Sequence, residues 1–71
     1  MDYTVIYEET PTGFSAFLPD LPGCVAAGAT RADVEMLIRS AVTLHLEAMR
    51  EAGEPLPAPS TRAGTVTVAS R

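Results

Sequence analysis

The chain has 71 residues, which is enough for one small domain. A core of this size supplies only about 3 to 5 kcal/mol, and small folds usually add disulfides, a metal ion or a partner subunit. One cysteine and one histidine exclude an internal disulfide and a zinc site with three or four Cys or His ligands. Association with another chain is the remaining way to supplement the stability of the core.

The charge balance argues against nucleic-acid partners. Nine acids against five arginines give a net charge of −4, and the arginines are spread along the chain instead of forming a phosphate-binding cluster. No window approaches the roughly 20 apolar residues of a membrane span, and the Met-Asp start does not resemble a signal peptide. We therefore expect a cytoplasmic protein without membrane association or direct DNA binding. An acidic surface suits a basic partner, and it also serves solubility.

Alternating apolar and polar side chains predict four strands. Residues 2–8 and 14–18 form a hairpin around a turn in which Gly13 can adopt a positive φ. The short apolar segment 24–28 is a third strand, and residues 65–69 are a fourth. In the first strand the side chains on one face are Tyr3, Val5 and Tyr7.

Residues 31–52 predict one amphipathic helix, with Thr30 as its N-cap and Gly53 placed to end it. Its apolar stripe is expected to comprise Val34, Leu37, Ile38, Ala41, Leu44, His45 and Ala48. At 1.5 Å per residue the helix would be roughly 33 Å long, enough to cover one face of the sheet. Residues 54–60 contain three prolines and form a stiff, extended strap. The expected fold is α+β, in the order β-β-β-α-β, with an antiparallel-rich sheet.

The run P-D-L-P-G-C joins the second and third strands as a rigid corner. Pro19 and Pro22 fix their own φ and push the preceding residues toward extended geometry, while Gly23 permits a sharp change of direction. Leu21 is expected to anchor the corner in the core. Asp20 is expected to point outward, and a rigid loop loses little entropy on docking. A purely structural corner and a partner contact both remain open.

We expect no catalytic residue, cofactor or metal. Cys24 and His45 would lack an orienting third group and oxyanion donors, so a structural role is the favoured interpretation. Glu8 and Glu9 are neighbours in a strand and point to opposite faces, so they do not converge on a metal ion with the other acids. The isolated glycines match neither dinucleotide-binding nor Walker spacing.

Together these features resemble the HicB family of antitoxins and related HicB-like small proteins. The resemblance rests on the opening strand YTVIYEE, on TGFSAFLPDLPGC, and on GATRADVEMLIRSAVTLHLEAMREAGEPLPAPS as helix and strap, and it covers residues 3–68. It implies a truncated RNase H-like fold without the nuclease carboxylates. It also implies an inhibitor that covers the active site of a small, basic, mRNA-cleaving HicA-type toxin. Family members commonly form dimers or tetramers.

Many family members carry a C-terminal DNA-binding segment. The sequence ends soon after the predicted fourth strand, so we expect a single domain over residues 1–71 without such a segment. The residues expected to contact the toxin are Glu8, Glu9 and Asp20. Two alternatives remain open: an orphan HicB-like scaffold or regulatory protein with no toxin, and a residual hydrolase that uses Mg²⁺ or the Cys24 and His45 pair.

Overall fold

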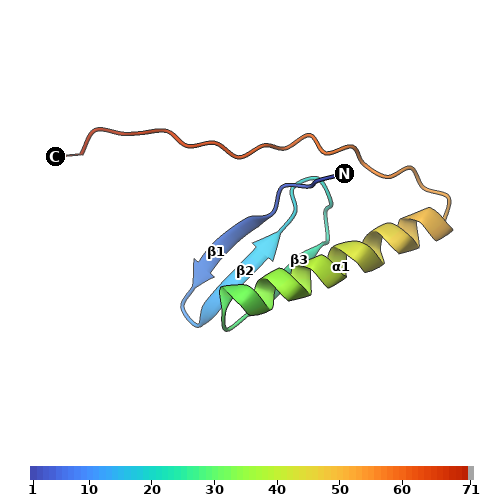
Figure 1. Cartoon of the computed structure of the whole chain (residues 1–71), viewed down its shortest axis with the longest axis horizontal. Helices are drawn as coiled ribbons and strands as arrows, with labels where there is room; N and C mark the ends of the chain where they lie inside the picture. Colours follow the sequence, from blue (N-terminus) through green and yellow to red (C-terminus); the bar gives the residue numbers. More distant parts are fainter. Residues whose placement is uncertain (71) are drawn as a thin grey trace.

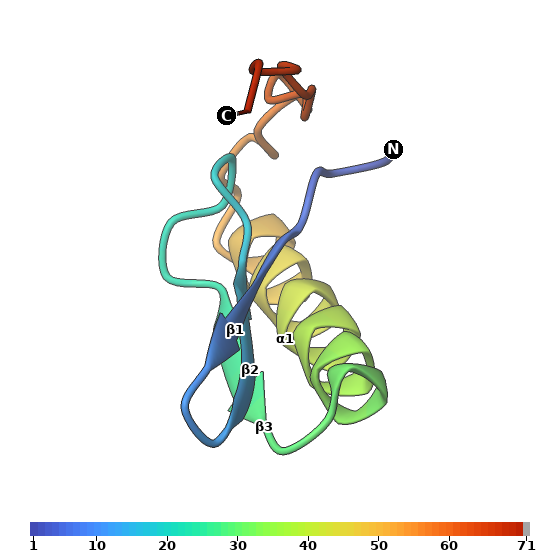
Figure 2. The same cartoon turned by 90° about the vertical axis from the view of Figure 1, so that its left-hand side faces the viewer.

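The computed structural model describes residues 1–70 and contains three strands followed by one long helix. Strands β1 (Ile6–Thr10), β2 (Gly13–Phe17) and β3 (Val25–Gly28) form an antiparallel sheet in the order β1-β2-β3. Helix α1 (Arg31–Glu51) lies across one face, mainly against β2 and β3 (Figure 1). Sheet and helix form two layers, and the chain after the helix runs above them (Figure 2). The predicted α+β class is confirmed.

The register of the sheet separates a covered face from an open one. Tyr7, Ala16 and Ala26 pair side by side and belong to or pack against the core. Because successive residues of a strand alternate between faces, the next row points away from the helix. This open row consists of Ile6, Phe17 and Val25. Phe17 is 37% exposed and Val25 is 66% exposed, so the open face is partly apolar.

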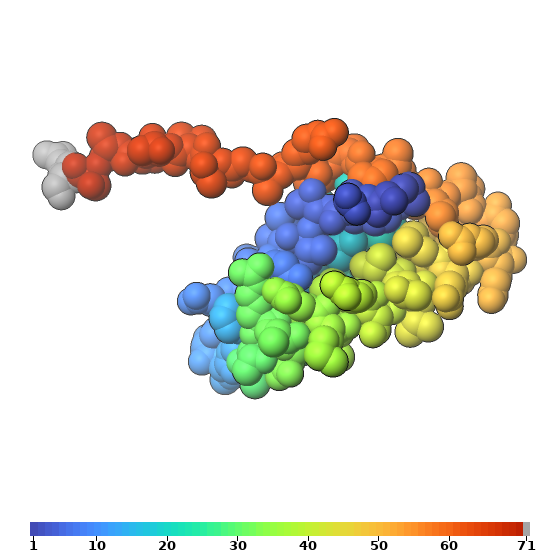
Figure 3. Space-filling view, viewed as in Figure 1, coloured from blue at the N-terminus to red at the C-terminus, as the bar shows by residue number. Residues whose placement is uncertain are grey.

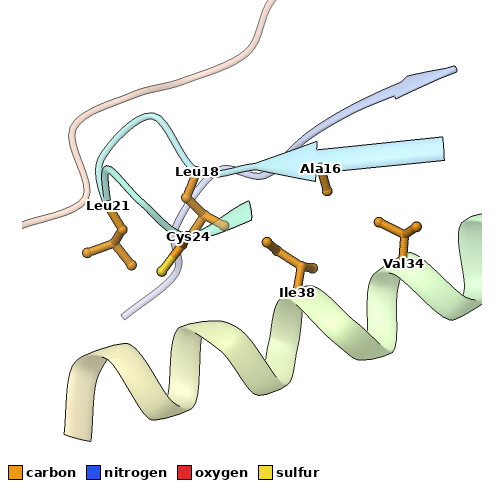
Figure 4. Close-up of a cluster of buried hydrophobic side chains, with 6 residues drawn as sticks. All are labelled: Ala16, Leu18, Leu21, Cys24, Val34 and Ile38. Carbon is orange, nitrogen blue, oxygen red and sulfur yellow. The ribbon is translucent and has the colours of Figure 1, made fainter. Parts of the chain in front are cut away.

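The core joins β2, the rigid corner and the first half of the helix. Its buried side chains are Ala16, Leu18, Leu21, Cys24, Val34 and Ile38 (Figure 4). Leu21, at the centre of the corner, is only 1% exposed, so its predicted anchoring role is confirmed. Gly23 has φ +94°, as the predicted change of direction requires. Backbone hydrogen bonds from Leu21 N to Leu18 O and from Cys24 N to Leu21 O brace the corner.

The predicted N-cap and the glycine beyond the helix are confirmed, although the helix ends at Glu51, one residue before the predicted bound. The Thr30 hydroxyl accepts a hydrogen bond from Asp33 N at 3.1 Å, which satisfies one of the free donors of the first turn. Gly53 adopts φ +74° beyond the last turn, and Glu54 N donates to Met49 O at 2.9 Å. The Arg31 guanidinium lies 4.4 Å from the Tyr7 ring centroid and links the start of the helix to β1.

The predicted apolar stripe of the helix was partly wrong. Leu37 and Leu44 are 50% and 66% exposed. The face that meets the sheet follows a row of every fourth residue, in which Val42 continues from the buried Val34 and Ile38. A three-stranded sheet of four- and five-residue strands is too narrow to cover the whole stripe, so its flank stays in solvent.

Two predictions about strands need correction. The first strand runs over Ile6–Thr10 instead of residues 2–8, because Ile6 pairs with Phe17, the last residue of β2, and Thr10 pairs with Gly13, the first. The fourth strand expected at 65–69 is absent, and residues 54–70 contain neither helix nor strand. A strand requires a hydrogen-bonded neighbour, and residues 62–70, which we call the tail, extend alone beyond the body of the molecule (Figure 3). No helix within residues 1–70 combines the length and apolar character needed to cross a membrane.

Candidate partner-binding surface

Asp20 holds the proline strap against the rigid corner. Its carboxylate accepts hydrogen bonds from the Ser60 backbone N at 2.9 Å and the Ser60 hydroxyl at 3.0 Å. It also accepts from the Thr61 backbone N at 3.0 Å and the Thr61 hydroxyl at 2.7 Å. We call these three residues the Asp20 clasp. The clasp joins positions forty residues apart, and the four donors occupy much of the carboxylate's acceptor capacity.

The N-terminal segment holds the same strap from a second side. The Tyr3 hydroxyl donates to Pro57 O, and the Thr4 hydroxyl donates to Thr61 O at 2.6 Å. Prolines cannot donate backbone hydrogen bonds, so a proline-rich segment must be fixed through its carbonyl oxygens or its flanking residues. Tyr3 binds a carbonyl oxygen within the strap, whereas Thr4 and the Asp20 clasp bind residues at the end of the strap.

Hydrogen bonds from Thr61 and Ser60 stabilise the charged form of Asp20 and hold its pKa well below the ordinary value of 3.8. The sign of the resulting pH dependence follows from linkage. Above about pH 5 the carboxylate is ionised in both the folded and the unfolded chain, and the clasp contributes its full stabilisation. As the pH falls below that value the unfolded chain takes up a proton first, and the contribution is progressively lost.

Asp20→Asn should release the strap while leaving the sheet and helix in place. We expect faster hydrogen exchange at the Ser60 and Thr61 amides, because the neutral amide accepts weaker hydrogen bonds than the carboxylate. The wild type should lose protection at these amides as the pH falls below about 4, and the variant should not show that loss. Asp2→Asn, at an exposed acid, is the matched control. Equal protection in Asp20→Asn and the wild type at neutral pH would contradict this role.

The structure does not bring the three predicted contact residues together. Glu8 and Glu9 are exposed near the β1–β2 turn, whereas Asp20 follows β2 at the opposite end of the sheet. Glu8 pairs with Ser15 and lies on the same face as Ile6, so its carboxylate borders the open apolar row. A contact through Glu8 and Glu9 remains a prediction. Asp20 is engaged within its own chain, and its contribution to a partner surface would come through the shape of the strap.

The thiol and the imidazole do not form a recognisable reaction centre. Cys24 is 3% exposed within the hydrophobic core, and burial raises the pKa of its thiol. A thiol with a raised pKa forms little thiolate and is a poor nucleophile. His45 is half-buried on the helix and is not part of the core cluster around Cys24. Within residues 1–70 no group of three His, Cys, Asp or Glu side chains is placed to hold a metal ion.

A groove of about 440 Å³ runs between the N-terminal segment with β1 and the helix. One wall carries Tyr3, Val5 and Tyr7, and the other carries Ile38 and Val42. Charged side chains of Asp2, Glu35 and Arg39 also line the groove. Because α1 packs mainly against β2 and β3, the covered face beside β1 is the less completely filled part of the molecule.

Sequence reasoning missed Tyr3, Thr4, Ser60 and Thr61 as the residues that fix the strap. No local pattern indicates them, since hydroxyl-bearing residues are common and the partners are more than fifty residues apart for Tyr3 and Thr4. The acid on the rigid corner was a partial indication that Asp20 binds another segment, because a carboxylate readily accepts several hydrogen bonds.

The structure is a small α+β protein in which the Asp20 clasp holds the protein's own strap in position. Comparison with known proteins gives the family. Residues 3–68 match the family described as "HicB_like antitoxin of bacterial toxin-antitoxin system", and the chain belongs to this family.

Two relatives have similar sequences. A protein from the rep-hol intergenic region of Haemophilus phage HP1 is 35% identical over 57 residues, which are 80% of this chain and 43% of that protein. A UPF0150 protein of Thermoplasma acidophilum is 31% identical over 58 residues, which are 80% of this chain and 84% of that protein. The chain therefore spans less than half of the phage relative and most of the archaeal one.

Two solved structures share the fold. They are a chain of the "HicA3 and HicB3 toxin-antitoxin complex" and the "Antitoxin HicB3 crystal structure". Each is 37% identical to this chain, with a TM-score of 0.69 over 84% of it, and the matched parts are 70% and 44% of those chains. The family resemblance inferred from the sequence is confirmed.

Proposed function

We propose that the chain is an antitoxin that binds a small HicA-type, mRNA-cleaving toxin and blocks its active site. The observation that carries the proposal is the likeness, at 37% identity and a TM-score of 0.69, to a chain of a HicA3–HicB3 complex. The family match over residues 3–68 supports the same role. On this proposal the protein works by steric occlusion and carries out no chemistry itself.

The charge of the chain suits such a partner. A toxin that cleaves mRNA must attract phosphates and is expected to be basic, whereas this chain has a net charge of −4. Glu8 borders the open apolar row of the sheet, so that face combines exposed apolar area with negative charge. We place Glu8 and Glu9 at the toxin contact. Asp20 acts indirectly, by holding the strap in position.

We further propose that the antitoxin acts in the cytoplasm, where its toxin and mRNA are present, and that it forms a homo-oligomer. A domain of this size has a small core, and association is a common way to supplement it. Exposed apolar side chains on the sheet, helix and tail are consistent with burial in an assembly.

Glu8→Arg should weaken neutralisation of the toxin without unfolding the antitoxin. The experiment co-expresses the chain with a HicA-type toxin and measures growth. Wild type should restore growth, and Glu8→Arg should restore it less, because it places a positive charge against a basic surface. Glu47→Arg makes the same change at an exposed position on the helix and should match wild type.

Two outcomes would count against the proposal. Equal rescue by Glu8→Arg and wild type would remove Glu8 from the contact. Absence of rescue by the wild-type chain, with both proteins expressed, would contradict the antitoxin role and favour an orphan scaffold or regulatory protein.

A further inference from the structure

The tail contains a strand-like segment without a neighbour. Residues 64–69 read G-T-V-T-V-A and alternate threonine with valine, a pattern typical of a strand with one buried face. In the structure Val66 is 87% exposed and Val68 is 78% exposed. Both valines therefore lie in water, although this alternating sequence is suited to pairing.

The sheet offers a free edge beside an apolar groove. Strand β1 pairs with β2 on one side only, so its other edge presents unpaired backbone donors and acceptors within the described structure. The groove lies between this strand and the helix, and its apolar lining includes Tyr3, Val5 and Val42. A strand added at this edge would bring its inward side chains over the groove.

The direction of the tail points to another molecule as the acceptor. The Asp20 clasp fixes Ser60 and Thr61, and beyond them the tail runs away from the sheet (Figures 1 and 3). The Cα radius of gyration is 14.4 Å and the longest dimension 53 Å, whereas a compact chain of this length has a radius of about 11 Å. The eight residues 62–69 span about 26 Å when extended, enough to reach across a second copy.

We infer that residues 64–69 of one copy add as a strand to the free edge of β1 in a second copy. Val66 and Val68 then lie over the groove between β1 and α1, and the second copy reciprocates. The exchange buries four valines, completes the sheet of each copy and supplies the association that the small core requires. This inference rests on the proposed self-association and specifies the segment and the edge that produce it.

The first test measures self-association of the protein alone. The double variant Val66→Asp/Val68→Asp is compared with Thr65→Asp/Thr67→Asp, which adds the same charge on the other face of the segment. Light scattering and sedimentation equilibrium should show a wild-type dimer. Its dissociation constant should rise by about 10⁴-fold or more in the valine variant, because the dimer loses four buried valines and each accounts for at least about tenfold. The threonine variant should remain close to wild type.

The second test locates the segment directly. In a dimer of one ¹³C-labelled and one unlabelled copy, cross-peaks between chains should join the Val66 and Val68 methyl groups to the rings of Tyr3 and Tyr7. Cross-peaks confined to one chain would show that the segment closes on its own sheet and would overturn the inference. A wild-type monomer would overturn both the self-association and its mechanism. A dimer unaffected by the valine variant would overturn the mechanism alone, and toxin neutralisation is measured separately in every case.

Discussion

Leu21→Ala should lower the free energy of unfolding by about 2 to 5 kcal/mol, the usual range for truncating a buried leucine. Leu21 is 1% exposed and lies between the two prolines of the corner, where it contacts the core from outside the regular elements. Pro19 and Pro22 limit how far the corner can collapse into the space left behind. The cavity would therefore persist, and the effect should fall in the upper part of the range.

The measurement is urea denaturation followed by circular dichroism at one fixed protein concentration, because association contributes to apparent stability. Leu44→Ala is the matched control: it removes the same atoms from a side chain that is 66% exposed, and should change stability by less than about 0.5 kcal/mol. A domain of this size has little stability to lose, so Leu21→Ala is expected to be largely unfolded. Similar denaturation midpoints for the two variants would contradict the anchoring role.

Gly13→Ala should also be strongly destabilising, for a reason that the sequence does not reveal. Gly13 opens β2 and does not have a positive φ; the described glycines with positive φ are Gly23 and Gly53. A Cβ at Gly13 would collide with the carbonyl oxygen of Gly28 and would lie 2.8 Å from Ala29 Cα. Both are backbone atoms, so relief requires β2 and the end of β3 to move apart.

We expect Gly13→Ala to cost about 1 to 3 kcal/mol or more, the range for overpacked sites. Thr12→Ala is the control, because it lies next to Gly13 at an exposed position of the turn. Urea denaturation compares the two variants, and hydrogen exchange of the β3 amides reports whether the strand pairing loosens. Unchanged stability in Gly13→Ala would show that the strands separate more easily than the close approach indicates.

Local patterns were enough to predict most of the fold. The hairpin follows from alternation around a proline and glycine turn, and the helix ends follow from Thr30 and Gly53, whose side-chain hydroxyl and positive φ act within a few residues. The rigid corner was equally local, because two prolines and a glycine restrict their own backbone. Such features do not depend on distant parts of the chain.

The features that sequence reasoning missed depend on contacts between distant residues. The extent of β1 is set by where β2 ends, at the pairing of Ile6 with Phe17. The position of Asp20 is set by Ser60 and Thr61, forty residues later. An alternating segment such as 64–69 indicates a capacity to form a strand, but the presence of a free partner edge decides whether it pairs. The family could be predicted because its pattern extends over residues 3–68, whereas individual contact residues could not be fixed.

The proposed function is that the chain covers a toxin's active site, and a titration of toxin activity tests it most directly. Purified HicA-type toxin is mixed with increasing amounts of the chain, and cleavage of a labelled mRNA is followed. Cleavage should fall linearly to zero at a fixed molar ratio, with no cleavage restored by excess RNA once the complex has formed. A tight complex that still cleaves RNA at the rate of free toxin would contradict occlusion.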